Sequence, residues 1–533
     1  MRRVPYLWLL IFLLALLLLV AGGRIAPQDE ETTFRMTANL LEYQRLTLTT
    51  QDFTLHPQTF PGFLPREQPR TLITTWAGPG TDGQTYPQYT HAQSLFEIPL
   101  YWVGRLLGGD ATTLTGVALT KFTTSLLNAI LISITGWLTA IFASHLGLSR
   151  RLSVLLGLTY PLATMALAYV DTNFSEPLLA LAMLLAAYLV YQARFDHPLR
   201  HLAFAGAALG LAVYTRERSV ILLPPFLLYV FLTQPRYSMK KWLAFLLPIG
   251  IAGVLIGLWN WQRFGSPLVT SYAAWQPETG FGTPLVVGAY GLWLSAGKGL
   301  LLYNPIAWLG LLGVRSLWWR DRTLTILIGL SLIIPTIFFA RYDLWTGGWN
   351  WGPRYLLPLL PLLILTAGVW VHAHPSRLRC GALLAVCVLG LALNLPTVLV
   401  DHSRYLVDAG ERDPEQFLKR SLLQFEASPL TQQWPAVLEL ARVYQQPEVW
   451  TTVQGTLDRR LQGYSGGTDL ESLSTELLWV DEFLRLNVPA PWLFRLILLG
   501  YPRWGIGLAV SLLLVLLVTT GYALWRFVRA SAV

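Results

Sequence analysis

Long runs of apolar residues recur along most of the chain, and short polar segments separate them. The first runs from Val4 to Val20, and another runs from Leu243 to Leu258. Such runs approach the roughly 20 residues that cross a bilayer as one helix. The pattern therefore predicts an all-α polytopic membrane protein with about 12 transmembrane helices. They are expected near residues 5–22, 113–146, 151–170, 175–193, 199–215, 219–233, 241–260, 300–314, 323–340, 355–371, 380–399 and 505–525.

Two segments between these spans are long enough to fold outside the bilayer. In the first, residues 23–112, Asp29, Glu30 and Glu31 directly follow the first span. We expect a short interfacial helix there with these carboxylates at its N-terminus, where the helix dipole favours negative charge.

The second outer segment, residues 401–504, has the composition of a soluble protein. Its apolar residues recur at helical spacing, which predicts amphipathic helices. These residues are Leu430, Trp434, Val437, Leu438, Leu440 and Ala441. We therefore expect a transmembrane domain in residues 1–400, a small, mainly helical external domain in 401–504, and a last transmembrane helix with a cytosolic tail in 505–533.

Composition supports this class of protein, because 53% of the 533 residues are hydrophobic and only 13% are charged. The charged fraction is about half that of an ordinary soluble domain. Cys380 and Cys387 lie on one predicted helix, about 10 Å apart, which is beyond disulfide reach. We expect neither a disulfide scaffold nor a cysteine metal site.

The net charge of +9 raises the question of a nucleic-acid partner, but its distribution indicates membrane topology instead. Sixteen of the 39 basic residues fall on the segments predicted to be inside, together with two carboxylates, Asp196 and Asp321. The sixteen are Arg2, Arg3, Arg150, Arg151, Arg194, Arg200, Arg236, Lys240, Lys241, Arg315, Arg320, Arg322, Arg377, Arg379, Arg526 and Arg529. The positive-inside rule then places both termini in the cytoplasm of a plasma (inner) membrane protein. A signal peptide over residues 2–23 is the alternative for the first span.

Several short motifs resemble a known family. Asp29-Glu30-Glu31 follows the first span, and the chain then reads Tyr86-Pro87-Gln88-Tyr89-Thr90-His91-Ala92-Gln93-Ser94 before Ile98-Pro99-Leu100-Tyr101. Further along come Asn173-Phe174-Ser175-Glu176-Pro177, Tyr214-Thr215-Arg216, Gly297-Lys298-Gly299-Leu300 and the segment from Trp345 to Tyr355. Together they resemble the GT-C fold glycosyltransferases that depend on polyprenyl phosphate, such as the protein O-mannosyltransferases and the lipid A aminoarabinose transferases.

The resemblance implies that residues 1–400 are a catalytic GT-C bundle. Such a bundle takes a sugar from a polyprenyl-phosphate carrier and places it on a hydroxyl of a glycan, lipid or protein outside the cytoplasm. No nucleotide is needed. Such chemistry requires a base for the acceptor proton, and the resemblance assigns this role to an acid of the first loop. Asp29 is the matching position, Glu30 or Glu31 is an alternative, and a solvated acid at a helix start is the structural explanation.

Basic residues on the outer side contradict the positive-inside rule and need another explanation. We expect Arg216, Lys298 and Arg354 to hold the carrier phosphate as its charge develops. Snorkelling to lipid headgroups is the alternative for each of them. Lys121, inside the second span, either faces a cavity or snorkels.

Many GT-C enzymes use a divalent metal. Asp29, Glu30, His91 and Glu176 supply carboxylates and an imidazole on the outer side, and these ligand types suit Mg, Mn or Zn. Their spacing predicts no geometry. His91 also fits a hydrogen-bonded structural histidine, and Glu176 fits a helix start before Pro177.

One outer loop gathers Asp343, Trp345, Trp349 and Trp351. Asp343, Trp345 and Trp349, together with Glu176, are predicted to contact the substrate, through sugar hydroxyls or by stacking. An aromatic belt at the membrane interface is the alternative for the tryptophans.

Two other classes of function fit the apolar composition. A transporter or flippase of lipid-linked sugars would also be basic inside, but such proteins usually show internal repeats and broken helices, which are not visible here. The other class is an inactive scaffold whose external domain binds cell-wall material. The joint presence of Asp29, Lys298 and Arg354 favours the enzyme.

Overall fold

The computed structural model describes residues 4–26, 28–48, 52–55, 70–73, 75–233, 238–348, 350–406 and 420–530. These residues are mostly helical. The N-terminal half contains α1 (Val4–Val20), α2 (Asp29–Tyr43), β1 (Asp52–Leu55), β2 (Arg70–Ile73), β3 (Ala77–Pro79), β4 (Thr85–Pro87), α3 (Ala92–Leu106), α4 (Leu114–Ser125), α5 (Leu127–His145), α6 (Arg150–Leu162), η1 (Met165–Asp171), α7 (Glu176–Gln192), α8 (Pro198–Thr215), η2 (Glu217–Leu222), α9 (Leu223–Thr233) and α10 (Met239–Phe264).

The C-terminal half contains α11 (Ser271–Trp275), α12 (Leu285–Leu294), α13 (Leu300–Tyr303), α14 (Ile306–Arg320), α15 (Arg322–Arg341), η3 (Arg354–Leu359), α16 (Leu360–Ala373), α17 (Arg377–Asn394), η4 (Leu395–Val398), η5 (Phe425–Ala427), α20 (Pro429–Val443), α21 (Pro447–Gln462), α22 (Leu470–Asn487), α23 (Trp492–Leu498) and α24 (Arg503–Arg529).

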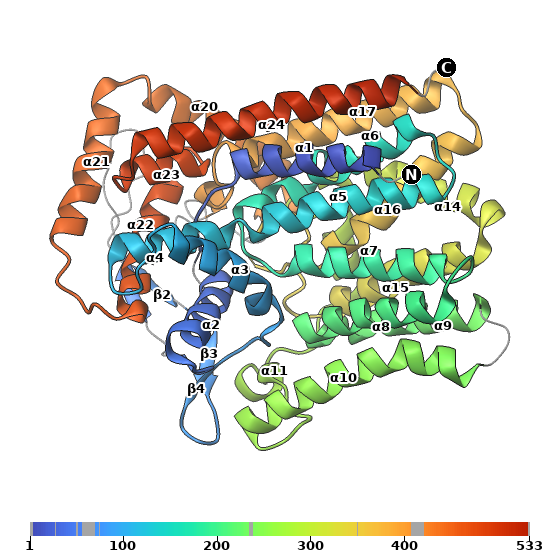
Figure 1. Cartoon of the computed structure of the whole chain (residues 1–533), viewed down its shortest axis with the longest axis horizontal. Helices are drawn as coiled ribbons and strands as arrows, with labels where there is room; N and C mark the ends of the chain where they lie inside the picture. Colours follow the sequence, from blue (N-terminus) through green and yellow to red (C-terminus); the bar gives the residue numbers. More distant parts are fainter. Residues whose placement is uncertain are drawn as a thin grey trace.

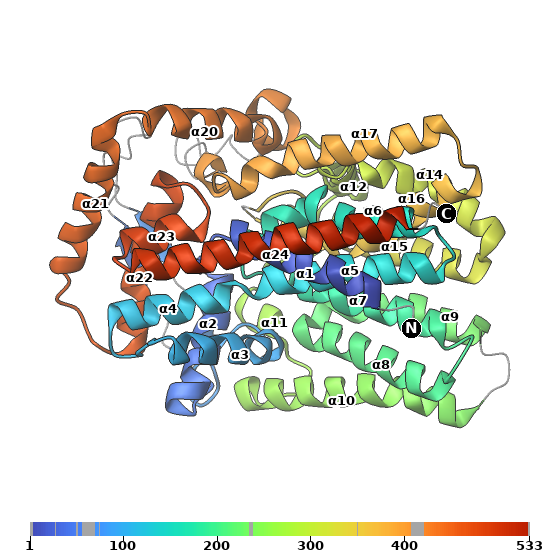
Figure 2. The same ribbon diagram turned by 45° about the horizontal axis from the view of Figure 1, so that its top comes forward.

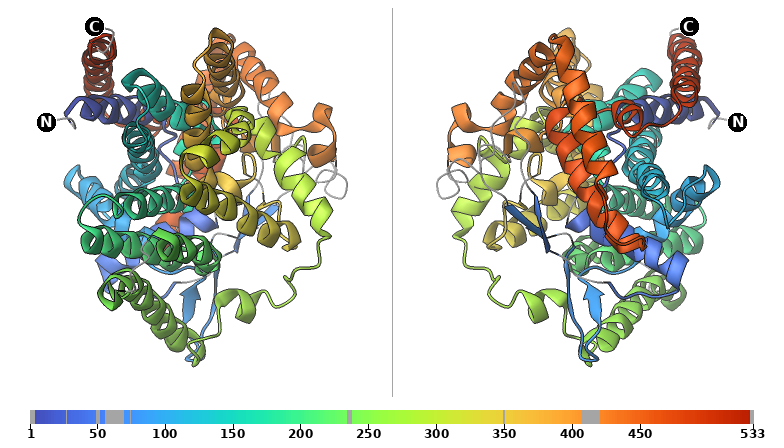
Figure 3. Two further views of the ribbon diagram at one scale, coloured as in Figure 1. Left: turned by 90° about the vertical axis from the view of Figure 1, so that its right-hand side faces the viewer. Right: turned by 90° about the vertical axis from the view of Figure 1, so that its left-hand side faces the viewer.

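The long apolar helices run side by side as one bundle (Figure 1). Within it, α8 packs between α7 and α10, α14 packs against α16, and α1 packs against α5 and α24. Helix α1 begins and α24 ends at the same end of the bundle, and the first-loop elements and α20–α23 gather at the other end (Figure 1). Figure 3 shows the packed pair of α1 and α24 at the edge of the bundle.

Six helices in the described residues are long and apolar enough to cross a membrane. They are Leu114–His145, Met239–Phe264, Arg322–Arg341, Arg354–Ala373, Arg377–Val398 and Arg503–Arg529. A seventh span results if α6 and η1, which meet at a 52° bend, count as one. Shorter apolar helices include Tyr6–Val20, Glu176–Gln192 and Leu285–Leu294. The mostly helical, apolar architecture is confirmed, and the count of about 12 spans stays a prediction.

The first outer loop contains the expected helix, because α2 begins at Asp29. It is not all-helical, however. The described residues include two antiparallel strand pairs, in which Asp52 lies opposite Ile73 and Ala77 lies opposite Pro87. These short strands carry too few residues for an alternating apolar pattern to reveal them in the sequence.

The segment 401–504 contains the amphipathic helices that its pattern predicted, with α22 against α4 (Figure 2). Its apolar residues share one core with the first loop, in which Val453, Leu477 and Val480 pack with Phe34 and Val117. In α20 the buried positions are Pro429, Leu430, Gln433, Ala436, Leu440 and Val443, whereas Trp434 and Leu438 are exposed. Its packing face is therefore rotated from the predicted one.

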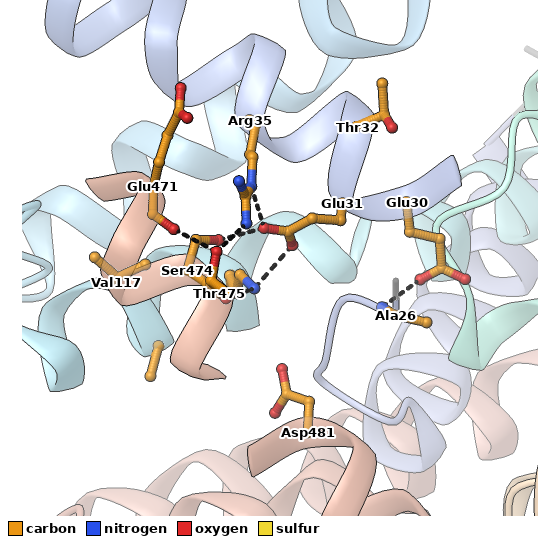
Figure 4. A network of polar contacts seen from close by, with 12 residues as sticks. Ala26, Glu30, Glu31, Thr32, Arg35, Val117, Glu471, Ser474, Thr475 and Asp481 are labelled. Atoms are coloured by element: carbon orange, nitrogen blue, oxygen red, sulfur yellow. Dashed lines mark hydrogen bonds and ion pairs between the residues drawn. The ribbon is translucent and has the colours of Figure 1, made fainter. Parts of the chain in front are cut away.

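A buried ionic network fixes α2 against α4 and α22 (Figure 4). Glu31 lies 2.8 Å from Lys121 Nζ and 2.6 Å from Arg35 Nε, and Ser474 Oγ donates to it at 2.5 Å. Burial alone would raise the pKa of Glu31, but Lys121 and Arg35 outweigh it and lower the pKa. Lys121 therefore joins a packed ionic network, and Glu31 contributes to the position of α2.

Candidate active site

Asp29, the first residue of α2, lies against two arginines and a tyrosine. Its Oδ2 is 3.2 Å from Arg354 Nη1 and 3.6 Å from Arg216 Nη2, and Tyr89 donates its hydroxyl to Oδ1. Burial alone would raise the pKa of Asp29, but Arg354, Arg216 and the bond from Tyr89 lower it overall. The carboxylate is therefore ionised at neutral pH.

The backbone just before Asp29 is strained. Gln28 has a φ of 66° and a ψ of −106°, which side-chain-bearing residues rarely adopt. Its backbone pairs with Thr75, and its carbonyl accepts from Thr32 N at 2.9 Å. Strain of this kind costs about 1–3 kcal/mol and persists where surrounding contacts hold it, often at functional sites.

Glu30, the next residue, differs from Asp29 in its protonation state. Its Oε2 accepts from Ala26 N at 3.0 Å, and burial raises its pKa to about 8. Glu30 is therefore mainly protonated at pH 7, which leaves Asp29 as the ionised carboxylate of the two predicted catalytic acids. Environments that separate the pKa values of two neighbouring carboxyl groups in this way are common at active sites.

The motifs that carried the family resemblance meet around Asp29. Tyr89 comes from the segment before α3, and Arg216 comes from the end of α8. Arg216 Nε donates to Ser175 Oγ at 2.7 Å, and its guanidinium lies 3.9 Å from the centre of the Tyr89 ring. Asn173 Nδ2 donates to Glu97 at 2.7 Å. Long-range contacts thus convert four separate motifs into one site.

Arg354 connects this site to the aromatic loop. Its Nε lies 3.7 Å from Glu176 Oε1, so its guanidinium faces both Glu176 and Asp29. Gly347 has a φ of +70°, and a Cβ there would lie 2.9 Å from Arg354 Cγ. Glycine at this position therefore permits both the turn and the close approach of Arg354.

Lys298 has a different environment from the other two predicted phosphate-binding residues. Its Nζ donates to Gly348 O at 2.9 Å and to Asn350 O at 2.5 Å, and it also reaches Asn350 Oδ1 at 3.1 Å. Burial and the nearby Arg354 lower the pKa of Lys298 well below its ordinary value. In this structure Lys298 holds the loop that carries Gly348 and Asn350.

A cavity of about 490 Å³ opens beside Asp29. This is within the size range of small-molecule sites. Its lining includes Asp29, Glu30, Arg354 and Tyr355, whereas Arg216 lies behind Asp29. Of the three predicted phosphate-binding cations, the structure brings Arg354 to the cavity surface.

Other charged residues of the cavity escaped the sequence analysis. Arg24 forms an ion pair with Asp401, and Asp171, His402 and Arg485 line the same space. Arg24 follows α1, Asp171 ends η1, Asp401 and His402 follow η4, and Arg485 lies on α22. No short motif joins them, because they meet only in the folded chain. The unusual outer position of Arg24 was the one available signal.

The remaining predicted substrate residues are scattered. Glu176 contacts Arg354, but Asp343 is exposed and accepts from the backbone N–H groups of Gly280 and Gly282 at 2.8 and 2.7 Å. Trp345 packs on α12, where a Cβ on Gly291 would lie 2.2 Å from its ring. Trp349 lies outside the described residues.

The predicted metal ligands are not assembled. Among the residues that the structure describes, no group of three or more His, Cys, Asp or Glu side chains is placed to hold a metal ion. His91 packs its ring edge-on against Trp259 at 4.2 Å, and burial lowers its pKa to about 4, with Arg263 adding to the effect. Asp29 is engaged by arginines. This donor set does not fit a bound metal, and a metal requirement stays a prediction.

Comparison with known proteins agrees with the class of this site. Residues 101–261 match the family described as dolichyl-phosphate-mannose-protein mannosyltransferase. The resemblance to a glycosyltransferase family is thereby confirmed over this segment, which includes Glu176 and Arg216. No curated protein matches the chain.

Among solved structures, the chain is similar to the crystal structure of ArnT from Cupriavidus metallidurans bound to undecaprenyl phosphate. The two share 15% sequence identity with a TM-score of 0.41, and the match covers 90% of this chain and 76% of that chain.

Proposed function

We propose that the protein is a membrane glycosyltransferase that moves a sugar from a polyprenyl-phosphate carrier to a hydroxyl acceptor on the non-cytoplasmic side. The observation that carries the proposal is the ionised Asp29 beside Arg354 on the wall of a cavity of about 490 Å³. A base and a cation at one point are what displacement of a phosphate by a hydroxyl needs.

In the proposed reaction, Asp29 removes the proton from the acceptor hydroxyl. The acceptor oxygen then bonds to the anomeric carbon, and the bond from that carbon to the phosphate oxygen breaks with its electron pair going to the phosphate. Arg354, with Arg216 behind Asp29, offsets the charge that develops on the leaving polyprenyl phosphate. Lys298 holds the loop beside Arg354.

The contacts of Asp29 also imply how its basicity changes during the reaction. The arginines that lower its pKa are the groups that a carrier phosphate would engage. Once their charge is shared with the phosphate, the pKa of Asp29 rises, and the carboxylate becomes a better base when the donor is bound. The site therefore couples donor binding to proton removal.

A second, small cavity supports the position of the lipid. It is lined mainly by apolar residues such as Leu222, Phe339 and Leu359, and Arg218 and Glu176 supply its polar groups. Tyr355 lines this cavity and the larger one. We propose that the apolar residues around this small cavity face the carrier chain, with the phosphate near Arg354 and Arg218.

The proposed orientation rests on charge. Basic residues cluster at connections such as 193–200 and 314–322, whereas the cavity lies among first-loop residues that follow the C-terminal end of α1. The positive-inside rule then places the cavity outside and both termini in the cytoplasm. The match to a transferase family favours an enzyme over a transporter or flippase. We propose that the reaction uses neither a nucleotide nor a nucleic acid.

The test is an Asp29→Asn variant, which keeps the shape of the side chain but removes the base. Transfer from a polyprenyl-phosphate sugar should fall about 10²- to 10⁴-fold. Glu30→Gln and Glu31→Gln serve as matched neighbours, and thermal unfolding checks the fold of each variant. Wild-type turnover in all three variants would make the first-loop acids structural and refute the mechanism.

A further inference from the structure

Asp171 is a buried carboxyl group that the proposed mechanism does not use. It is only 7% exposed and lines the large cavity, and beyond the backbone N–H of Gly22 its two oxygens have no hydrogen-bond partner among the described residues. A buried polar group with unfilled hydrogen-bond positions is costly, so such groups generally bind water or a ligand. A carboxyl group keeps accepting lone pairs whether or not it is protonated, which makes Asp171 a receptor for hydrogen-bond donors.

His402 supplies a second acceptor on the same cavity. It is 6% exposed, and its Nδ1 has no hydrogen-bond partner among the described residues. Burial lowers its pKa to about 4, so the ring is neutral at pH 7, and one of its nitrogens accepts a hydrogen bond. The nearest charge is Asp401 Oδ1, which lies 3.9 Å from Nδ1.

The cations near Asp171 and His402 are already paired. Arg24 forms an ion pair with Asp401, and Arg485 forms one with Glu482. Burial would raise the pKa of Asp401, but Arg24 and other neighbours hold it well below its usual range. These charges offset one another, which disfavours a phosphate or carboxylate ligand here.

The charges around His402 differ from those around Asp29. The pKa of Asp29 responds to Arg354, Arg216 and Arg218, whereas the pKa of His402 responds to Asp401, Lys298, Arg485 and Arg24. Trp76 and Phe174 line the same cavity and offer aromatic surface. Among the described residues, this lining offers acceptors for hydroxyl groups and aromatic surface, and each of its arginines is ion-paired. Together these features match a neutral sugar.

We propose that Asp171 and His402 form a carbohydrate subsite, in which they accept hydrogen bonds from the hydroxyls of a neutral sugar. The proposal rests on the proposed transfer function and deepens it. Two sugars have this chemistry, the one carried by the lipid phosphate and the one that receives it, and the test separates them.

The full-length protein, purified in nanodiscs, is titrated with methyl α-mannopyranoside and methyl α-glucopyranoside, and binding is followed by saturation-transfer NMR. Asp171→Leu and His402→Leu each remove the accepting atom and should weaken binding about tenfold to a hundredfold, the value of a hydrogen bond to a buried group. Thr172→Val is the matched control, because Thr172 lines the cavity but its hydroxyl donates to Tyr169 O at 3.2 Å.

A further variant guards against misfolding. In Gly22→Ala the new Cβ would lie 3.2 Å from both Cγ and Oδ1 of Asp171, so it shifts this carboxyl group without replacing the residue. It should weaken glycoside binding in the same direction. If neither glycoside binds the wild-type protein, or if binding survives Asp171→Leu and His402→Leu, the subsite is refuted.

Carrier binding is measured separately with sugar-free undecaprenyl phosphate and an Arg354→Gln variant. Loss of carrier binding with retained glycoside binding supports two distinct subsites. Retained carrier binding in Arg354→Gln would count against the proposed phosphate site and leave the glycoside result readable. Competition by undecaprenyl-phosphate mannose but not by the sugar-free carrier identifies the donor sugar as the occupant, and no competition by either identifies the acceptor.

Discussion

Nη1 of Arg354 lies 3.2 Å from Oδ2 of Asp29, although 325 positions separate the two residues in the chain. Asp29 begins the helix after the first span, and Arg354 begins the turn before α16. The pair closes one side of a large cavity and determines the protonation of Asp29. Asp29, the proposed base, and Arg354, the proposed phosphate-binding cation, therefore form an ion pair with each other.

This pairing predicts different pH profiles for the free and donor-bound enzyme. In the free enzyme the arginines lower the pKa of Asp29, so its acid limb in kcat/KM lies below that of an ordinary aspartate. In the donor complex the phosphate shares the arginines, and the limb in kcat moves to higher pH. Both profiles are measured in a Glu30→Gln background. Coincident limbs would argue against release of Asp29 by the donor.

Replacement of Arg354 and Lys298 should have separable effects. Arg354→Lys removes the planar group that reaches both Asp29 and Glu176, and carrier binding should weaken about tenfold or more. Lys298→Met removes three hydrogen bonds to residues 348 and 350, and should lower the melting temperature instead. Weaker carrier binding at unchanged stability in Lys298→Met would return Lys298 to the phosphate site.

The raised pKa of Glu30 predicts that the stability of the fold depends on pH. Its folded pKa of about 8 exceeds the ordinary value near 4.3, so the folded state binds more protons between these values. Stability of the wild type should therefore decrease as pH rises through this window. Glu30→Gln removes the effect, and its melting temperature should exceed that of the wild type by a margin that increases from pH 5 to pH 8 and then levels off. A constant margin would contradict the raised pKa.

Membrane orientation is tested by cysteine labelling. Ser465, after α21, is exposed and should react with an impermeant reagent from outside when changed to cysteine. His374, at the end of α16, is the matched inner position and should react only after permeabilisation. Both variants need a Cys380→Ser background, because Cys380 is exposed. The reverse labelling pattern would invert the topology and move the proposed site to the cytoplasmic side.

The sequence by itself determined the class of protein and several local elements. Apolar runs predict spanning helices because the bilayer requires them, and α2 begins at Asp29 as its three acids suggested. Arg216 and Arg354 also stood out as candidates because outer basic residues depart from the charge rule, and Asp29 stood out through the family resemblance. These signals lie in residue type, spacing and position relative to the spans.

Only the tertiary structure decided which of these residues meet and what they contact. Lys298 resembles a phosphate ligand in its glycine-rich motif, but it donates to a neighbouring loop. Asp171 and His402 belong to no shared motif, and they line one cavity because η1 and the segment after η4 pack together. The periodicity of apolar residues indicates only which residues share a face of one helix. The contacts of this site depend instead on how helices far apart in the sequence pack together, and the site exists because of that packing.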